Sequence, residues 1–176
     1  GMYEVAAAIN NVEIVELPLL STFDLPPIAE IEDKLTSTGL LFICSPNNPT
    51  GNYISLEQLK EIALAFYGIV VVDEAYIDFS DNPSAISLLN DIPNLVILQT
   101  FSKAYGLAGA RVGMAFASRE IISVLNKIKP PYNINTLSME AAYNALRNEK
   151  KISSQIKAIK NEREVLRIAL LDLCIV

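Results

Sequence analysis

Three short apolar runs stand out along the chain, and each is followed by polar residues. They occupy residues 40–44, 69–72 and 95–98. A continuous apolar run of this length, bounded by turn residues, is typical of a strand that is buried on both faces. We therefore predict three buried strands, and a further strand over residues 112–117. Residues 12–17 alternate apolar side chains with glutamates, the period-two pattern of a half-buried strand.

Segments with helical periodicity lie between and after these strands. We predict helices over residues 3–9, 26–35, 55–66, 84–89, 119–128, 135–147 and 151–173. Ser55 and Gln58 have the spacing of a capping box at the start of the third helix, and Gly68 follows its end. The alternation of strands and helices predicts an α/β fold: a three-layer sandwich with a mixed, mostly parallel sheet between helices.

Composition limits the classes of protein that fit this chain. Of the 176 residues 51% are hydrophobic and 19% are charged, and the formal net charge is −6. An acidic chain with scattered basic residues argues against a nucleic-acid partner or an anionic membrane surface. No apolar run reaches the roughly 18 residues that a membrane-spanning helix needs. We expect a soluble, cytoplasmic protein.

The residue types available for chemistry are restricted. Histidine is absent, which excludes imidazole as a catalytic base or as a metal ligand. The two cysteines, Cys44 and Cys174, are far apart and form no Cys-x-x-Cys motif. We therefore expect neither a disulfide framework nor a metal site. Any catalysis must use lysine, tyrosine, aspartate or glutamate side chains.

Polar side chains that are capable of chemistry follow each of the three buried runs. They are Asn48 after the first run, Asp73 and Tyr76 after the second, and Thr100, Ser102, Lys103 and Arg111 after the third. The carboxyl ends of parallel strands meet at one edge of a sheet, where α/β proteins bind ligands. Each residue has an ordinary explanation as a turn, a cap, a packed ring or a solvated loop. Together they predict one ligand site around a common cavity.

Pyridoxal 5'-phosphate is a ligand that uses all of these groups. Its aldehyde pairs with a lysine amine, its ring nitrogen with a carboxylate, and its phosphate with hydroxyl groups and a guanidinium. Three motifs resemble the signature of the fold-type I aminotransferases. They are Asn-Pro-Thr-Gly at residues 48–51, Asp-x-x-Tyr at 73–76, and Ser-Lys at 102–103 followed by Arg111. In detail, the segments are most similar to those of histidinol-phosphate aminotransferases.

The resemblance implies that Lys103 is the catalytic residue. Its amine would bond covalently to the cofactor's aldehyde and then carry a proton between the substrate's α-carbon and the cofactor. Asp73 would face the ring nitrogen and keep it protonated, so that the ring can accept electrons.

The resemblance also implies how the remaining residues hold the cofactor. Asn48 and Tyr76 would hydrogen-bond the phenolic oxygen of the ring. Thr100, Ser102 and Arg111 would bind the phosphate, the arginine through its planar fork of donors.

The activity that the resemblance implies is transamination between histidinol phosphate and 2-oxoglutarate in histidine biosynthesis. The partners would be a small-molecule amino donor, a 2-oxo acid acceptor and a second copy of the protein in a homodimer.

We expect residues 1–150 to be part of the cofactor-binding large domain and residues 151–176 to be a helix that leads toward a small domain. The family's ring-stacking aromatic residue, phosphate turn and carboxylate-binding arginine have no counterpart in this sequence, so we expect the 176-residue chain alone to be inactive.

Two other classes of function share single features with this chain. Residues 70–74 resemble the Walker B strand of an ATPase, but the chain contains no Gly-x-x-x-x-Gly-Lys-Ser/Thr loop. Gly106, Gly109 and Gly113 lack the Gly-x-Gly-x-x-Gly spacing of a dinucleotide site. Two alternatives stay open: an amino-acid phosphate decarboxylase on the same fold, and a fragment that binds the cofactor without catalysis.

Overall fold

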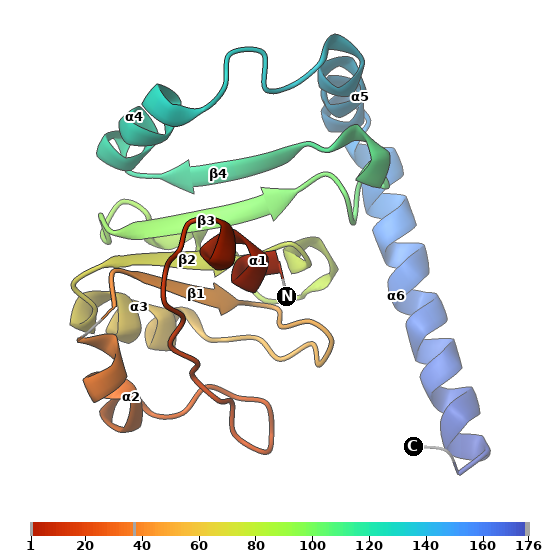
Figure 1. Ribbon diagram of the computed structural model, residues 1–176. Coiled ribbons are helices and arrows are strands. Elements are labelled where there is room, and N and C mark those ends of the chain that lie inside the picture. The colour runs from red at the N-terminus through yellow and green to blue at the C-terminus, as the bar shows by residue number, and fades with distance from the viewer. Residues whose placement is uncertain (1, 37, 175–176) are drawn as a thin grey trace.

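A mixed sheet forms the centre of the computed structural model, which describes residues 2–36 and 38–174. Among these residues the sheet has four strands, in the order β1 (Leu40–Cys44), β2 (Ile69–Asp73), β3 (Leu95–Thr100) and β4 (Gly113–Ala117). β1, β2 and β3 are parallel, and β4 is antiparallel to β3 (Figure 1). The mixed, mostly parallel sheet predicted from the sequence is confirmed.

Helices connect the strands and follow the sheet. The α-helices are α1 (Met2–Ile9), α2 (Ile28–Leu35), α3 (Leu56–Ala65), α4 (Arg119–Ile128), α5 (Thr136–Arg147) and α6 (Glu149–Asp172), and the 3₁₀ helices are η1 (Ile77–Phe79), η2 (Ala85–Leu88) and η3 (Ala108–Ala110). The predicted helices agree with these bounds to within about two residues. The Ser55 hydroxyl accepts a hydrogen bond from the Gln58 amide at 3.1 Å, so the predicted cap of α3 is confirmed.

The strand predicted over residues 12–17 is wrong. This segment has no regular secondary structure, and it crosses one face of the sheet between α1 and α2 (Figure 1). Val12 and Ile14 are exposed, whereas Leu17 packs against the core. Alternation stabilises a strand only when a neighbouring edge supplies hydrogen-bond partners, and among the described residues no strand pairs with this segment.

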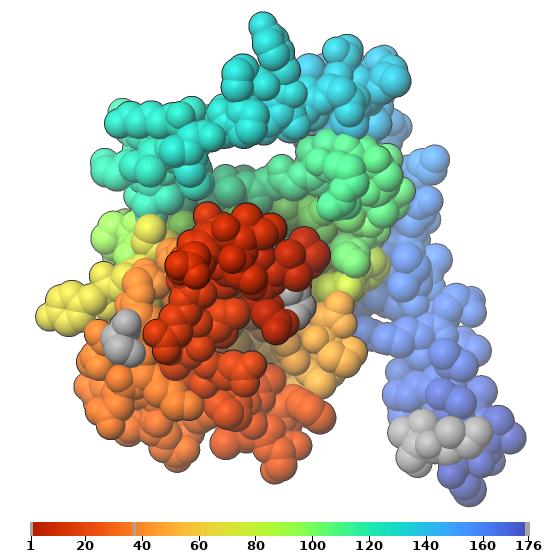
Figure 2. Space-filling view, viewed as in Figure 1, coloured from red at the N-terminus to blue at the C-terminus, as the bar shows by residue number. Residues whose placement is uncertain are grey.

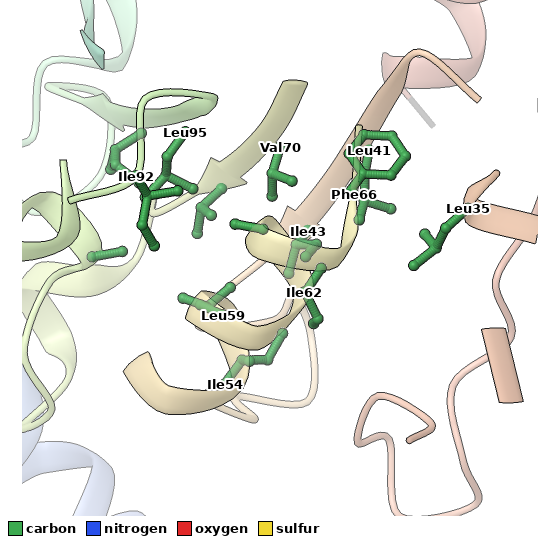
Figure 3. Close-up of a cluster of buried hydrophobic side chains, with 14 of the residues drawn as sticks. Leu35, Leu41, Ile43, Ile54, Leu59, Ile62, Phe66, Val70, Ile92 and Leu95 are labelled. Atoms are coloured by element: carbon green, nitrogen blue, oxygen red, sulfur yellow. The ribbon is translucent and has the colours of Figure 1, made fainter. Parts of the chain in front are cut away.

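The main core lies between the sheet and the helices α2 and α3. Leu59 and Ile62 of α3 are fully buried, and they pack in the same cluster as Val70 of β2 and Leu95 of β3 (Figure 3). Burial of an aliphatic side chain of this size stabilises the fold by about 1.5–3 kcal/mol. This cluster therefore fixes the positions of the strands that carry the polar residues.

The opposite face of the sheet is covered less completely. The Tyr3 ring of α1 stacks on the Phe42 ring of β1, with 4.7 Å between the ring centroids. Helices thus lie on both faces, as the three-layer prediction requires, and Figure 2 shows α1 and the segment after it over this face. The prediction that β1 is buried on both faces is wrong, because Leu40 and Phe42 remain 55% and 43% exposed. Only one face of β1 meets the core.

The amino ends of β2 and β3 are held close to α3 and β1. The Asn94 side-chain amide donates to the carbonyl oxygens of Ala63, Phe66 and Gly68 at 3.0, 3.1 and 2.9 Å. A Cβ atom on Gly68 would lie 2.2 Å from the Gly39 carbonyl oxygen, which only glycine avoids. These contacts align the strands, so that their carboxyl ends also meet.

The long helix α6 lies along one side of the molecule, next to α5 and η1 (Figure 1). Lys160 of α6 forms an ion pair with Asp81, which follows η1. In the described part of the chain, no helix is both long and apolar enough to cross a membrane.

Candidate active site

The carboxyl ends of β1, β2 and β3 meet at one edge of the sheet. Asp73 is the last residue of β2, where it pairs with Cys44 of β1, and Thr100 is the last residue of β3, where it pairs with Gly113 of β4. Because side chains alternate along a strand, Cys44, Asp73 and Thr100 all lie on the face that α1 covers. Lys103 is located in the loop that leaves this edge after β3.

Three of the predicted residues meet directly at this edge. The Asn48 side-chain amide donates a hydrogen bond to the Tyr76 hydroxyl at 2.8 Å. The Lys103 ammonium lies over the Tyr76 ring, 5.0 Å from the ring centroid, in a cation–π contact. The loops after β1, β2 and β3 therefore contribute one residue each to a continuous cluster around Tyr76.

Asp73 accepts a hydrogen bond on each of its carboxylate oxygens. Oδ1 accepts from the Ala75 backbone amide at 3.0 Å, and Oδ2 accepts from the Tyr3 hydroxyl. Burial first, and the hydrogen bond to Asp73 second, raise the pKa of Tyr3 well above its usual value. Burial likewise raises the pKa of Cys44, whose sulfur lies 3.7 Å from the Tyr3 oxygen. Tyr3 and Cys44 therefore stay neutral beside Asp73 at neutral pH.

Thr100 and Ser102 are held together by the loop itself. The Thr100 hydroxyl accepts a hydrogen bond from the Ser102 amide at 3.0 Å and donates to the Val112 carbonyl oxygen at 3.4 Å. Arg111 is exposed, has a left-handed backbone with φ of 55°, and donates from its guanidinium to the Ala108 carbonyl oxygen at 3.2 Å. The guanidinium therefore lies on the same loop without a direct bond to either hydroxyl in the described structure.

A cavity of about 580 Å³ adjoins the Asn48–Tyr76 pair. The loop after β1, the segment around η1, and α6 line it, and α6 contributes Lys160 and Arg163. Figure 2 shows the groove between α6 and the rest of the molecule. Asp73, Thr100 and Lys103 do not line this cavity, so the predicted residues share an edge of the sheet without all facing one enclosed space.

Glu74 supports this edge from the core side and was not predicted from the sequence. It is 2% exposed, and its carboxylate accepts hydrogen bonds from the Ser84 hydroxyl and the Ala85 amide, both at 2.6 Å, and from the Gln99 side chain at 2.9 Å. Two consecutive acids at the end of a buried strand indicate that one carboxylate points into the core, because successive side chains point to opposite faces of the sheet. Tyr3, by contrast, carries no local signal of its contact with Asp73.

Comparison with known proteins identifies the family. Residues 1–174 match the family model described as aminotransferase class I and II. The chain belongs to this family. Among aminotransferases, it is 56% identical over 167 residues to the histidinol-phosphate aminotransferase of Cytophaga hutchinsonii, covering 95% of this chain and 48% of that protein. The enzyme of the same name from Christiangramia forsetii is 49% identical, with 98% of this chain and 49% of that protein covered.

A solved structure of an aminotransferase has the same fold. The histidinol-phosphate aminotransferase of Sinorhizobium meliloti, crystallised with pyridoxal-5'-phosphate, superimposes with a TM-score of 0.87 at 26% identity. The match covers 97% of this chain and 47% of that one. The chain thus spans about half the length of the curated relatives and of the solved aminotransferase that it matches.

The substitution Glu74→Gln tests how strongly the site edge depends on its buried carboxylate. If the NH₂ group of the new amide faces Ala85, it meets the backbone N–H donor of that residue. If it faces Ser84 and Gln99, both side chains must reverse their hydrogen bonds to accept from it. We expect the free energy of unfolding to fall by about 2–3 kcal/mol, measured by urea denaturation of the full-length protein.

Glu61→Gln is the matched control for Glu74→Gln, because Glu61 is exposed on α3. Its stability should stay within about 0.5 kcal/mol of the unsubstituted protein. Equal stabilities of the two variants would show that the hydrogen bonds of Glu74 contribute nothing to the fold.

Proposed function

We propose that the protein that contains this chain is an aminotransferase that transfers the amino group of histidinol phosphate to 2-oxoglutarate. The products are imidazole acetol phosphate and glutamate, and the reaction belongs to histidine biosynthesis. The observation that carries the proposal is the meeting of Asn48, Tyr76 and Lys103 at the sheet edge that ends in Asp73 and Thr100. Identities of 56% and 49% to proteins named histidinol-phosphate aminotransferase support the choice of substrate.

The donor set at this edge fits pyridoxal 5'-phosphate as the cofactor. Lys103 supplies the amine for the aldehyde, and Asp73 supplies the carboxylate for the ring nitrogen. The phosphate would be held by hydroxyl groups and a guanidinium on one loop, from Thr100, Ser102 and Arg111. When bound, this cofactor supplies an electron-withdrawing ring that stabilises the negative charge left by removal of the substrate's α-proton.

The residues of the chain divide the work of the reaction between them. The Lys103 amine takes the proton from the α-carbon and returns it. Its contact with the Tyr76 ring keeps the amine at the edge of the sheet where the carboxyl ends of the strands meet. The Asp73 carboxylate holds a proton on the ring nitrogen. The Asn48 amide orients the Tyr76 hydroxyl, which can then donate to an oxygen of the ring.

The test of the proposed function is an assay of the full-length protein with histidinol phosphate and 2-oxoglutarate. We expect glutamate to form, and Lys103→Ala to lower kcat by at least about a thousandfold, since it removes both the nucleophile and the proton carrier. Borohydride reduction in the presence of pyridoxal phosphate, followed by peptide mapping, should modify Lys103. Lys127→Ala, a change at an exposed lysine of α4, should keep both activity and labelling.

The same assay, repeated with an amino-acid phosphate in place of histidinol phosphate, separates the alternatives. Release of carbon dioxide from the amino-acid phosphate without formation of glutamate would indicate an amino-acid phosphate decarboxylase, since histidinol phosphate itself has no carboxyl group to lose. Labelling of Lys103 without any turnover would indicate a protein that binds the cofactor and does not catalyse. Labelling spread over the surface lysines would contradict the assignment of Lys103 and of the cofactor site.

Asp73→Asn tests the proposed role of the carboxylate. A neutral amide cannot hold the proton on the ring nitrogen, so we expect kcat to fall by about a hundredfold or more. Pyridoxal phosphate should remain bound through the phosphate contacts, as measured by its visible absorption after gel filtration. A variant with nearly full turnover would show that Asp73 does not face the ring.

We propose in addition that the full-length protein is a cytoplasmic homodimer, in which residues 151–176 lead toward a second domain. Exposed apolar side chains on α4 and α5, including Ile128, Leu137 and Tyr143, support an interface. Sedimentation should give twice the monomer mass, and cell fractionation should recover the protein in the cytosol. A monomer at micromolar concentration would contradict the dimer.

A further inference from the structure

The hydrogen bond between Tyr3 and Asp73 joins residues that lie 70 positions apart. Tyr3 is in α1, on the exposed side of the sheet, and Asp73 ends β2. We propose that Tyr3 is a positioning residue for Asp73, which it holds in the orientation needed to face the ring of the cofactor. This inference rests on the proposed function, because it assigns Tyr3 a task in the same site.

Two hydrogen bonds restrain the Asp73 carboxylate. Oδ1 accepts from the Ala75 backbone amide at 3.0 Å, and the Tyr3 hydroxyl binds Oδ2. A carboxylate held on both oxygens cannot rotate about its terminal bond without losing one of them. Each oxygen has two lone pairs, so the restrained group still has capacity to accept a proton donor from a ligand.

Tyr3 is itself fixed by residues of β1. Its ring stacks on Phe42 at 4.7 Å with an interplanar angle of 29°, and its oxygen lies 3.7 Å from the Cys44 sulfur. The single hydrogen of the phenol is donated to Asp73, so the Cys44 thiol is the donor in the second contact. The Cys44 thiol thus donates to the Tyr3 oxygen, and the Tyr3 hydroxyl donates to the Asp73 carboxylate.

The protonation states agree with this chain of donors. Burial raises the pKa of both Tyr3 and Cys44, so the phenol and the thiol keep their protons at neutral pH. A phenol that stays protonated remains a hydrogen-bond donor to Asp73. The position of Cys44 beside Asp73 follows from the strand register, which pairs these two residues.

Tyr3→Phe tests this inference in the full-length holoenzyme, since it keeps the ring that stacks on Phe42 and removes only the hydroxyl. We expect kcat to fall about tenfold, the size of the loss of one hydrogen bond to a charged group. The dissociation constant of pyridoxal phosphate should rise about threefold or more, because its ring meets a less ordered carboxylate.

Tyr67→Phe provides the matched control, because Tyr67 is fully exposed. It should leave kcat, cofactor affinity and the unfolding midpoint unchanged. Tyr3→Phe should share that unfolding midpoint to within about two degrees, which separates a role in the site from a role in stability. A loss of activity that appears only together with a large fall in the unfolding midpoint would overturn the inference.

A double-mutant cycle shows whether Tyr3 acts through Asp73. In the Asp73→Asn background, Tyr3→Phe should change kcat and the cofactor dissociation constant by less than about twofold, because the group that Tyr3 positions is already lost. Fully additive effects would overturn the inference. Tighter binding of pyridoxal phosphate by Tyr3→Phe would overturn it as well, since the phenol would then be competing with the ring for Asp73.

The cycle also separates this inference from the proposed function. If Asp73→Asn is impaired and Tyr3→Phe behaves like Tyr67→Phe, the function stands and only the role of Tyr3 is wrong. If the unsubstituted protein does not bind pyridoxal phosphate at Lys103, the proposed function is wrong and the role of Tyr3 fails with it.

Discussion

The buried carboxylate of Glu74 is the contact on which the geometry of the site edge depends. Asp73 is the last residue of β2 and Glu74 follows it, and because side chains alternate along an extended chain the two point to opposite faces of the sheet. Glu74 ties the end of β2 to η2 and β3 through Ser84, Ala85 and Gln99. A buried carboxylate is costly unless its hydrogen bonds are made, so this arrangement permits one orientation of the strand end. The direction in which the Asp73 side chain points therefore depends on the hydrogen bonds of Glu74.

The parts of the fold that could be predicted from the sequence are those with a local signal. Continuous apolar runs followed by polar loops identified β1, β2 and β3, and the parallel order of these strands brought their polar ends to one edge. Ser55 identified the start of α3 in the same way, because its capping partner is only three residues away. Asn48, Tyr76 and Lys103 each follow one of these strands, so the parallel topology brings them into contact.

The parts that could not be predicted depend on contacts between distant segments. The alternation at residues 12–17 resembles a strand, but whether an edge is free to pair with it is decided elsewhere in the molecule. Phe42 is as apolar as its neighbours, yet it remains 43% exposed beside the Tyr3 ring of α1. The bond from Tyr3 to Asp73 and the left-handed backbone of Arg111 likewise have no marker in the nearby sequence.

The reversal of β4 has a consequence for how the proposed phosphate donors are held. The Thr100–Gly113 pair closes the loop between β3 and β4, and bonds from the Phe101 amide to the Val112 oxygen and from the Leu107 amide to the Phe101 oxygen bind the loop to itself. Phe101 and Val112 pack with Ala142 of α5 in a small core that is separate from the main one. The spacing of the hydroxyl groups and the guanidinium thus depends on this loop and on α5, and not on the helices that pack against the main core.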